Sequence, residues 1–220
     1  MKSLTRLADS TSPNSLAVKL RRQRFRLFKK LLDQLQRPIK ILDIGGTQYF
    51  WEAVGFVNEE GVEITLLNIE PQSTIYSNLK FIQGDANNLS IFDDNSFDVV
   101  FSNSVIEHLN SFENQKKMAL EVKRIGKRYW IQTPSFYFPI EQHFLCPFYH
   151  WLPIKTRILL LQHFDLGWFK KEKDYKIAYE LVTSIRLLTY KELKSLFPEA
   201  KIYKERFLGL TKSYIAYSGW

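Results

Sequence analysis

Five runs of apolar and β-branched residues are spaced along the first part of the chain, and they predict the strands of a sheet. They cover residues 39–44, 62–69, 79–85, 96–104 and 127–133. The first run, IKILDI, is apolar almost throughout, which is typical of a strand buried on both faces. The segment NSFENQKKMALEVKRIG before the fifth run has helical spacing, with Gly126 in place to end the helix. Strands that alternate with helices predict βαβ units and a parallel sheet.

A capping motif and a hairpin are predicted near the C-terminus. Thr189 and Glu192 have the spacing of a capping box at the start of the helical segment TYKELKSLF. Two β-rich runs then flank the turn LGLT within residues 200–220, which is typical of an antiparallel hairpin. The sequence contains no repeat and no linker, so we expect a single domain over residues 1–220.

A basic helix is predicted before the first strand. Residues 19–30, KLRRQRFRLFKK, contain seven of the basic residues behind a formal net charge of +8. Apolar residues recur among them at near-helical spacing, namely Leu16, Leu20, Phe28, Leu31, Leu32 and Leu35. We expect an amphipathic helix over about residues 15–36, ending before Pro38. Its charged face would be solvated, or it would contact nucleic acid or an anionic membrane surface.

Residues 134–188 break the regular pattern and are dense in aromatic residues, prolines and histidines. A segment of this length is too long for an ordinary connection, and such inserts usually form lids or binding loops. We call it the lid segment. The single cysteine, Cys146, lies within it, and we expect this thiol to be buried.

The remaining composition is that of an ordinary globular protein, with 45% hydrophobic residues. No run approaches the roughly 18 apolar residues that span a bilayer. The start of the chain, MKSLTRLADSTSPNS, lacks the apolar stretch of a secretory signal. One cysteine excludes an internal disulfide. We therefore expect a cytoplasmic protein, and the sequence does not indicate its oligomeric state.

The predicted parallel strands end on polar residues or turn glycines. Asp43, Gly45 and Gly46 end the first strand, Glu70 follows the second and Asp85 the third. Ligands of open α/β sheets bind outside these carboxyl ends. A carboxylate after the second strand can accept both hydrogens of a ribose diol, and one after the third can accept from an exocyclic amine. The pattern favours a ligand that contains adenosine.

The motifs ILDIGG, LLNIEP, QGDA and FDVVFSNSVIEHL, in this order, resemble those of class I S-adenosylmethionine-dependent methyltransferases. The resemblance extends over about residues 39–133 and is closest to the branch that modifies small molecules and glycans. It implies an α/β, Rossmann-like methyltransferase fold. Such a fold has a mostly parallel seven-stranded sheet, a C-terminal antiparallel hairpin and helices on both faces. It also implies S-adenosyl-L-methionine as the cofactor.

The resemblance gives the first loop a role in binding the methionine part of the cofactor. Gly45 and Gly46 would let the backbone lie against it, and Asp43 would order the loop and reach the cofactor's amino group through water. The loop departs from the commonest family pattern, acidic-x-Gly-x-Gly-x-Gly, because Gly46 is displaced by one position and Thr47 follows it. A β-branched residue disfavours positive φ, so we expect an allowed backbone path at Thr47, with its hydroxyl as a polar contact.

The resemblance also assigns residues at the ends of the other strands. Glu70 would hold the ribose hydroxyls. Asp85, with the backbone of Ala86, would bind the edge of the adenine. Asn103 and Ser104, after the fourth strand, would face the sulfonium and its methyl group.

Three residues are candidates to remove a proton from the methyl acceptor. His108 follows the fourth strand beside Glu107, while Glu141 and His143 lie in the lid segment. The alternatives are that His108 packs against the next helix and that the polar groups of the lid bond one another. The spacing of the histidines along the chain supports no metal site.

Absent motifs narrow the chemistry further. No Asn/Asp-Pro-Pro-Tyr follows the fourth strand, and Cys146 is not placed for attack on cytosine. We expect metal-independent methylation of an oxygen or nitrogen in a small molecule, sugar or lipid-linked intermediate. Tyr137, Trp151 and Trp168 are candidates to stack on a sugar. The alternatives are an RNA methyltransferase that uses the basic helix, and a non-catalytic binding module with this fold.

Substitutions in the first loop test the assignment of the cofactor site. Gly45→Val should abolish binding of S-adenosylmethionine by steric exclusion, whereas Thr47→Gly should be tolerated. Isothermal titration calorimetry on both variants measures this, and normal binding by Gly45→Val would show that the assignment of the loop is wrong.

Overall fold

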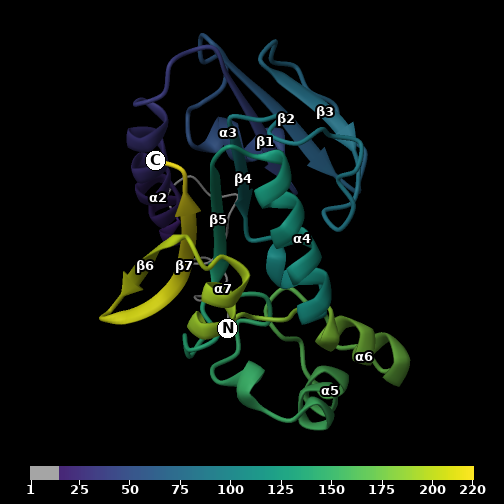
Figure 1. Ribbon diagram of the computed structural model, residues 1–220. Coiled ribbons are helices and arrows are strands. Elements are labelled where there is room, and N and C mark those ends of the chain that lie inside the picture. Colours follow the sequence, from purple (N-terminus) through teal and green to yellow (C-terminus); the bar gives the residue numbers. More distant parts are fainter. Residues whose placement is uncertain (1–14) are drawn as a thin grey trace.

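The computed structural model describes residues 15–220, which form one seven-stranded sheet with helices on both faces (Figure 1). The strand order is β3-β2-β1-β4-β5-β7-β6. The neighbouring strands among the first five are parallel to each other, and β7 runs antiparallel to both of its neighbours, β5 and β6. The strands are β1 (Ile39–Ile44), β2 (Val62–Asn68), β3 (Leu79–Gln83), β4 (Val99–Asn103), β5 (Tyr129–Pro134), β6 (Lys201–Phe207) and β7 (Leu210–Ser218). The α/β fold expected from the sequence is confirmed, although β3 and β4 are shorter than predicted.

The order of the strands places the binding edge of the sheet at β1 and β4. The chain builds β1, β2 and β3 in one direction and then returns to pair β4 with the other side of β1. In a sheet of this kind the crevice at such a reversal, outside the carboxyl ends of the strands, is where ligands bind. The loops after Ile44 and Asn103 lie next to each other there.

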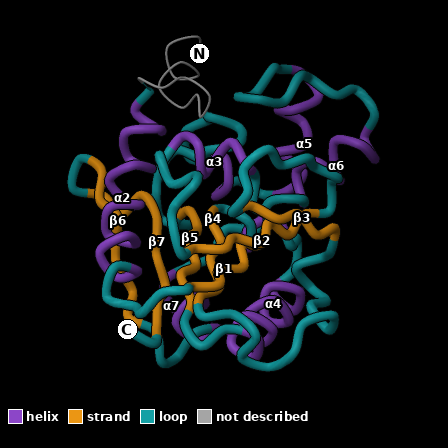
Figure 2. Tube along the Cα trace, turned by 90° about the horizontal axis from the view of Figure 1, so that it is seen from above, coloured by secondary structure: helices purple, strands orange, loops and turns teal. Residues whose placement is uncertain are grey.

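Alternate residues of the strands feed two separate apolar cores. In β1, Ile39 and Ile41 pack with α2 (Leu16–Leu32) and α3 (Gln48–Ala53). Leu42 and Ile44 point to the other face and pack with α4 (Phe112–Ile125) and α7 (Tyr190–Leu196). Figure 2 shows α2 and α3 on one side of the row of strands and α4 and α7 on the other. This alternation follows from the two-residue period of a strand, and it fixes the direction of every side chain at the binding edge.

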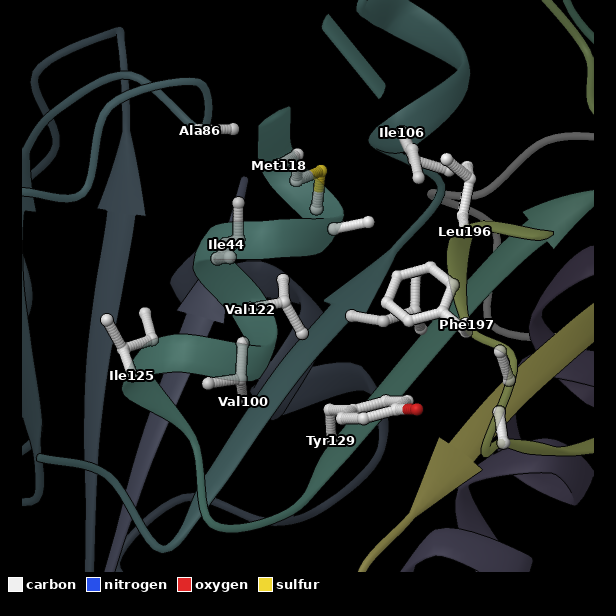
Figure 3. Packing of buried hydrophobic residues seen from close by; sticks show 14 of the residues in the cluster. Ile44, Ala86, Val100, Ile106, Met118, Val122, Ile125, Tyr129, Leu196 and Phe197 are labelled. Atoms are coloured by element: carbon white, nitrogen blue, oxygen red, sulfur yellow. The ribbon is translucent and has the colours of Figure 1, made fainter. Parts of the chain in front are cut away.

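The core under α4 consists mainly of aliphatic side chains, and Figure 3 shows Tyr129 and Phe197 among its aromatic rings. Val122 and Ile125 of α4 face Val100 of β4, while Tyr129 of β5 packs against Phe197 just after α7. The helix ends at Gly126 and α7 begins with the Thr189 capping box, and both features are as predicted. This core holds β4 and β5 in register beneath the binding edge.

The basic segment forms α2, which is shorter than the predicted span of residues 15–36. Ser15 caps its start and the helix ends at Leu32. Its buried face consists of Val18, Phe25, Phe28 and Leu32, and Phe28 packs on Phe101 and Trp130 of the sheet. The expected apolar stripe is therefore only partly correct, because Leu16 and Leu20 line a cavity instead of entering the core.

The lid segment has regular structure that its sequence pattern did not reveal. It contains η2 (Tyr149–Trp151), α5 (Ile154–His163) and α6 (Tyr175–Thr183). These helices close around an apolar cluster of their own, formed by Phe144, Tyr149, Ile158, Leu161, Leu166, Ala178 and Val182. Cys146, expected to be buried, is only half-buried. Figure 1 places α5 and α6 beyond the carboxyl ends of the central strands, where a lid was expected.

Within residues 15–220, no helix has the length and apolarity needed to cross a membrane.

Candidate functional site

A cavity of about 500 Å³ lies at the carboxyl ends of β1 and β4. Its wall is assembled from the loop after β1, the start of α2, the residues after β4, the lid segment and the C-terminal hairpin. Of the residues singled out in the sequence, it is lined by Asp43, Gly45, Gly46, Asn103, Ser104 and His143. Five distant parts of the chain thus enclose one space at the expected edge of the sheet.

Asp43 is the most deeply buried acidic residue of the first loop. It is in phase with Ile39 and Ile41, so its side chain points to the face covered by α3. The side chain is 2% exposed, and its Oδ2 accepts a hydrogen bond of 2.8 Å from the indole Nε1 of Trp51. Burial raises the pKa of Asp43 to about 8, and the hydrogen bond from Trp51 offsets only part of this rise.

The two glycines of the loop are required for different reasons. Gly45 has φ +72°, a left-handed conformation, and a Cβ there would lie less than 3.0 Å from the Val105 side chain. At Gly46 a Cβ would collide with the carboxylate of Asp43. Because both clashes are with the protein itself, Gly45→Val will distort the loop even without a ligand. Its loss of binding is therefore interpretable only if the variant retains its fold.

Thr47 takes the allowed path expected from its sequence. Its φ of −135° is extended, and its hydroxyl accepts a hydrogen bond of 3.3 Å from the backbone N–H of Phe50 as the N-cap of α3. Glycine is a tolerable N-cap, at a cost of only a few tenths of a kcal/mol relative to threonine. This geometry supports the expected tolerance of Thr47→Gly.

The residues assigned to the adenosine part lie outside the cavity. Glu70 and Asp85 are exposed just after β2 and β3, and Ala86 is buried against the core. Asp85 accepts hydrogen bonds from the backbone and side chain of Asn87, which fixes its turn. The three residues share the same edge of the sheet as the cavity, as adjacent parallel strands require, and their assigned roles stay predictions.

Asn103 and Ser104 border the cavity directly after β4. Ser104 has φ +57°, and its hydroxyl donates a hydrogen bond of 2.9 Å to Oε1 of Gln132 at the end of β5. Gln132 also lines the cavity. The left-handed turn at Ser104 thus brings polar groups from two neighbouring strands to the floor of the cavity.

Next to this floor, acidic and histidine side chains from η1 (Ile106–His108) meet the lid segment. The rings of His108 and His143 are 4.8 Å apart and nearly perpendicular. Glu107 is buried, and its Oε2 accepts a hydrogen bond of 3.0 Å from the hydroxyl of Thr133. Glu141, 2% exposed, contacts Nδ1 of His143 at 2.6 Å through Oε1. The structure therefore gathers all three candidate proton acceptors, together with Glu107, although the lid residues lie far along the chain.

The local environment changes the proton affinities of this group. Burial raises the pKa of Glu107 to about 7. Desolvation, and next the charge of His143, lower the pKa of His108. Desolvation lowers the pKa of His143 as well, but the hydrogen bond and charge of Glu141 outweigh it and raise that pKa overall. The pKa values of the two histidines are thus shifted in opposite directions, which makes His143 the better proton acceptor.

The cavity also contains a cluster of cationic side chains. Arg21 and Arg24 of α2 and Lys212 of β7 all line it. Arg24 pairs with Glu205 of β6 at 3.3 Å, and Nζ of Lys212 lies 3.9 Å from the same carboxylate. Burial lowers the pKa of Lys212 to about 8; Glu205 opposes this shift, and the charges of Arg24 and Arg21 add to it. Two of the seven basic residues around α2 therefore face the cavity, while Lys19, Arg22, Arg26 and Lys30 are exposed.

Several site residues were missed in the sequence analysis, namely Trp51, Gln132, Glu205 and Lys212. Gln132 lies near the carboxyl end of the fifth strand, two residues before Pro134, so a search of the last residues of each strand would have found it. The rest come from α3 and the C-terminal hairpin, and nothing local in the sequence distinguishes them. Of the aromatic residues proposed to stack on a sugar, Trp168 lines the cavity, whereas Tyr137 and Trp151 do not.

Residues 43–128 match a protein-family model described as a methyltransferase domain. The matched range begins at Asp43 and includes Glu70, Asp85 and the residues after β4. It covers less than half of the chain. No curated protein sequence matches the chain.

Solved structures share the fold at low sequence identity. The CurJ carbon methyltransferase matches 90% of this chain with a TM-score of 0.55 and 14% identity, and the chain spans 53% of that protein. A chain from the complex of the Haloferax volcanii Trm112 methyltransferase activator with a candidate methyltransferase matches with a TM-score of 0.50 and 14% identity, and the match covers 86% of each chain. A candidate O-methyltransferase from Nostoc punctiforme matches with a TM-score of 0.50 and 12% identity, and the match covers 88% of this chain and 55% of that protein. The likeness shows a Rossmann-like methyltransferase fold, and the family match over residues 43–128 supports methyl transfer.

The buried carboxyl of Asp43 predicts a pH dependence of stability. Between about pH 4 and pH 8 the folded chain keeps this proton while the unfolded chain releases it, so the free energy of unfolding falls as pH rises through this range. Asp43→Asn removes the ionisable group but keeps an oxygen for Trp51. Urea denaturation of both proteins from pH 4 to pH 9 should show the variant gaining stability relative to the wild type up to about pH 8. A constant difference between them would contradict the assignment.

Proposed function

We propose that this protein transfers the methyl group of S-adenosylmethionine to an oxygen or nitrogen of a small anionic acceptor, such as a sugar derivative or a lipid-linked intermediate. The observation that supports this most directly is the cavity itself. It extends from Gly45 and Gly46 past Asn103 and Ser104 to the lid segment, at the reversal of strand order. The end at Gly45 and Gly46 would hold the donor. The other end is enclosed by the lid segment, which is not part of the sheet.

The donor would lie along the carboxyl edge of β1, β2 and β3. Its methionine part would contact the backbone of Gly45 and Gly46, which line the cavity. Its ribose would meet Glu70 and its adenine Asp85, both of which are solvent-accessible at their strand ends. The sulfonium would then face Asn103 and Ser104 at the floor of the cavity.

Methyl transfer is an in-line displacement, in which the acceptor atom bonds to the methyl carbon while the carbon–sulfur bond breaks. The electron pair stays on sulfur, so the donor leaves as S-adenosylhomocysteine. Positioning and exclusion of water supply much of the rate of such a reaction. A hydroxyl or ammonium acceptor must also lose a proton. His143, held by Glu141 at the cavity wall, is placed on the acceptor's side.

The charge of the cavity favours an anionic acceptor. Arg21, Arg24 and Lys212 line it, and Glu205 is the carboxylate paired with two of them. Phosphate or carboxylate groups are the anions that such arginine and lysine side chains bind. Trp168 adds an aromatic face on which a sugar ring could lie.

The RNA alternative gains no support from the site. Arg21 and Arg24 face the cavity and Lys29 pairs with Asp33, which leaves Lys19, Arg22, Arg26 and Lys30 as the exposed basic residues of α2. The acceptor space is bounded by the lid segment, which suits a small molecule better than a polymer.

Binding of the donor can be tested with a carboxylate-to-amide exchange. Glu70→Gln should weaken binding of S-adenosylmethionine by about 10-fold or more, because it removes a charged acceptor from the ribose hydroxyls. The matched control is Glu113→Gln, an exposed glutamate in the first turn of α4 that does not line the cavity, which should bind normally. Calorimetry with S-adenosylmethionine and S-adenosylhomocysteine gives the affinities. Failure of the wild type to bind either compound would refute the proposal.

The acceptor class can be tested by release of S-adenosylhomocysteine from matched pairs of compounds. Hydroxy acids and sugar phosphates should be methylated, and their uncharged amide or dephosphorylated counterparts should react at least about 10-fold more slowly. Lys212→Met should raise KM for the anionic member with little change in donor affinity. Equal rates within each pair would show that charge does not select the acceptor.

A further inference from the structure

We propose that Glu107, His108 and His143 form a binding site for a divalent transition-metal ion beside the cavity. One ligand atom from each of the three residues lies within 4.8 Å of the others. Two imidazoles and one carboxylate suit ions such as Zn²⁺, Co²⁺ or Fe²⁺. The residues come from η1 and from the lid segment, so the fold and not the spacing brings them together. The proposal therefore departs from the expectation, based on spacing alone, that no metal binds.

The Glu107 carboxylate supplies the first argument. The residue is fully buried, and Thr133 satisfies its Oε2. Its Oε1 is also buried and has no hydrogen-bond partner within the part of the chain that the structure describes. Leaving a carboxylate oxygen unsatisfied away from water is costly, and buried polar atoms rarely remain so. A cation between Glu107 and the two histidines would satisfy this oxygen.

The orientation of His143 supplies the second argument. Its Nδ1 contacts Glu141, which leaves Nε2 available as a ligand. Glu141 is itself fixed, because its Oε2 accepts hydrogen bonds from the backbone N–H groups of His143 and Phe144 at 2.9 and 2.6 Å. Metal-bound histidines usually have this arrangement, with a carboxylate on the nitrogen that does not bind the metal. Thr133 plays the equivalent supporting part for Glu107.

A purely structural role of the lid segment would explain the contact between Glu141 and His143 but not the environment of Glu107 and His108. The pair of Glu141 and His143 could serve to hold the turn of the lid together. Such a role does not account for the unpartnered oxygen of Glu107, or for the His108 ring directed at His143. Ligands around one zinc ion lie about 3.4 Å apart, given bonds of about 2.1 Å. His108, which is exposed, is the ligand free to rotate inward.

The chemical role of this ion, unlike its binding, rests on the proposed methyl transfer. Three protein ligands leave at least one coordination position open, as in catalytic metal sites. His143 lines the cavity, so an ion bound to it would lie beside the space proposed for the acceptor. An acceptor hydroxyl or amine bound there would lose its proton more readily, because the ion would stabilise the anionic form. In the metal-bound protein this effect would replace the role of His143 as proton acceptor, since both of its ring nitrogens would be engaged.

Metal titration of the tag-free, chelator-treated protein, without S-adenosylmethionine, tests the site. Calorimetry with Zn²⁺ and with Co²⁺ should give one ion per chain. His108→Ala and Glu107→Gln should each weaken binding at least 10-fold. Glu141→Gln should weaken it by about 10- to 100-fold with unchanged stoichiometry, as expected for a residue that positions a ligand. His163→Ala, an exposed histidine on α5, is the matched control and should bind like the wild type.

Because His108 is exposed, its substitution should leave the melting temperature of the metal-free protein unchanged, so loss of binding would not reflect unfolding. The proposal is overturned if the wild type binds no tighter than His108→Ala, or if His163→Ala loses as much affinity. Absence of metal binding in a protein that binds S-adenosylmethionine would refute the metal site alone. Metal binding without donor binding would refute the methyl donor alone.

Discussion

Burial of carboxyl groups is the constraint on which the architecture around the cavity depends, because a carboxyl group removed from water must find hydrogen-bond donors or cations, or keep its proton. Within residues 15–220, four carboxyl groups are buried, and each is held by a different part of the chain. Their partners are Trp51 of α3 for Asp43, Thr133 of β5 for Glu107, the lid backbone for Glu141, and Arg24 of α2 with Ser213 of β7 for Glu205. Satisfying these groups fixes α2, α3, the lid segment and the hairpin around one space.

The sheet was predictable because its pattern is local and repeated. Runs such as IKILDI specify buried strands, and Gly126 and the Thr189 capping box mark helix ends by chemistry that acts within a few residues. The lid segment was not predictable in this way. Its helices bury small, separate faces against each other, so α5 and α6 depend on tertiary contacts such as those of Phe144 and Tyr149, which no short window of sequence displays. The burial of Phe25 in α2 also depends on tertiary contacts, in this case with Trp51 and Phe56.

The candidate site divides along the same line. Residues at strand ends, such as Asp43 and Asn103, could be found because parallel strands bring their carboxyl ends to one edge. Arg24, Glu205 and Lys212 could not be found in this way, because the sequence patterns around them are those of solvent-exposed charged residues. The contact between His108 and His143 could not be predicted either, because no local motif surrounds either residue. Only the fold of the lid segment over η1 brings the two rings together.

The contact between Asp43, Gly46 and Trp51 has a consequence for how this sequence can change over time. The carboxylate occupies the space that a Cβ at position 46 would need, and the indole supplies its hydrogen bond. Replacement of any one residue leaves a clash, a void or an unsatisfied group, and the other two must change with it. Positions 43, 46 and 51 should therefore covary as one unit among descendants of this chain, and glycine at position 46 reflects packing within the protein before any demand of a ligand.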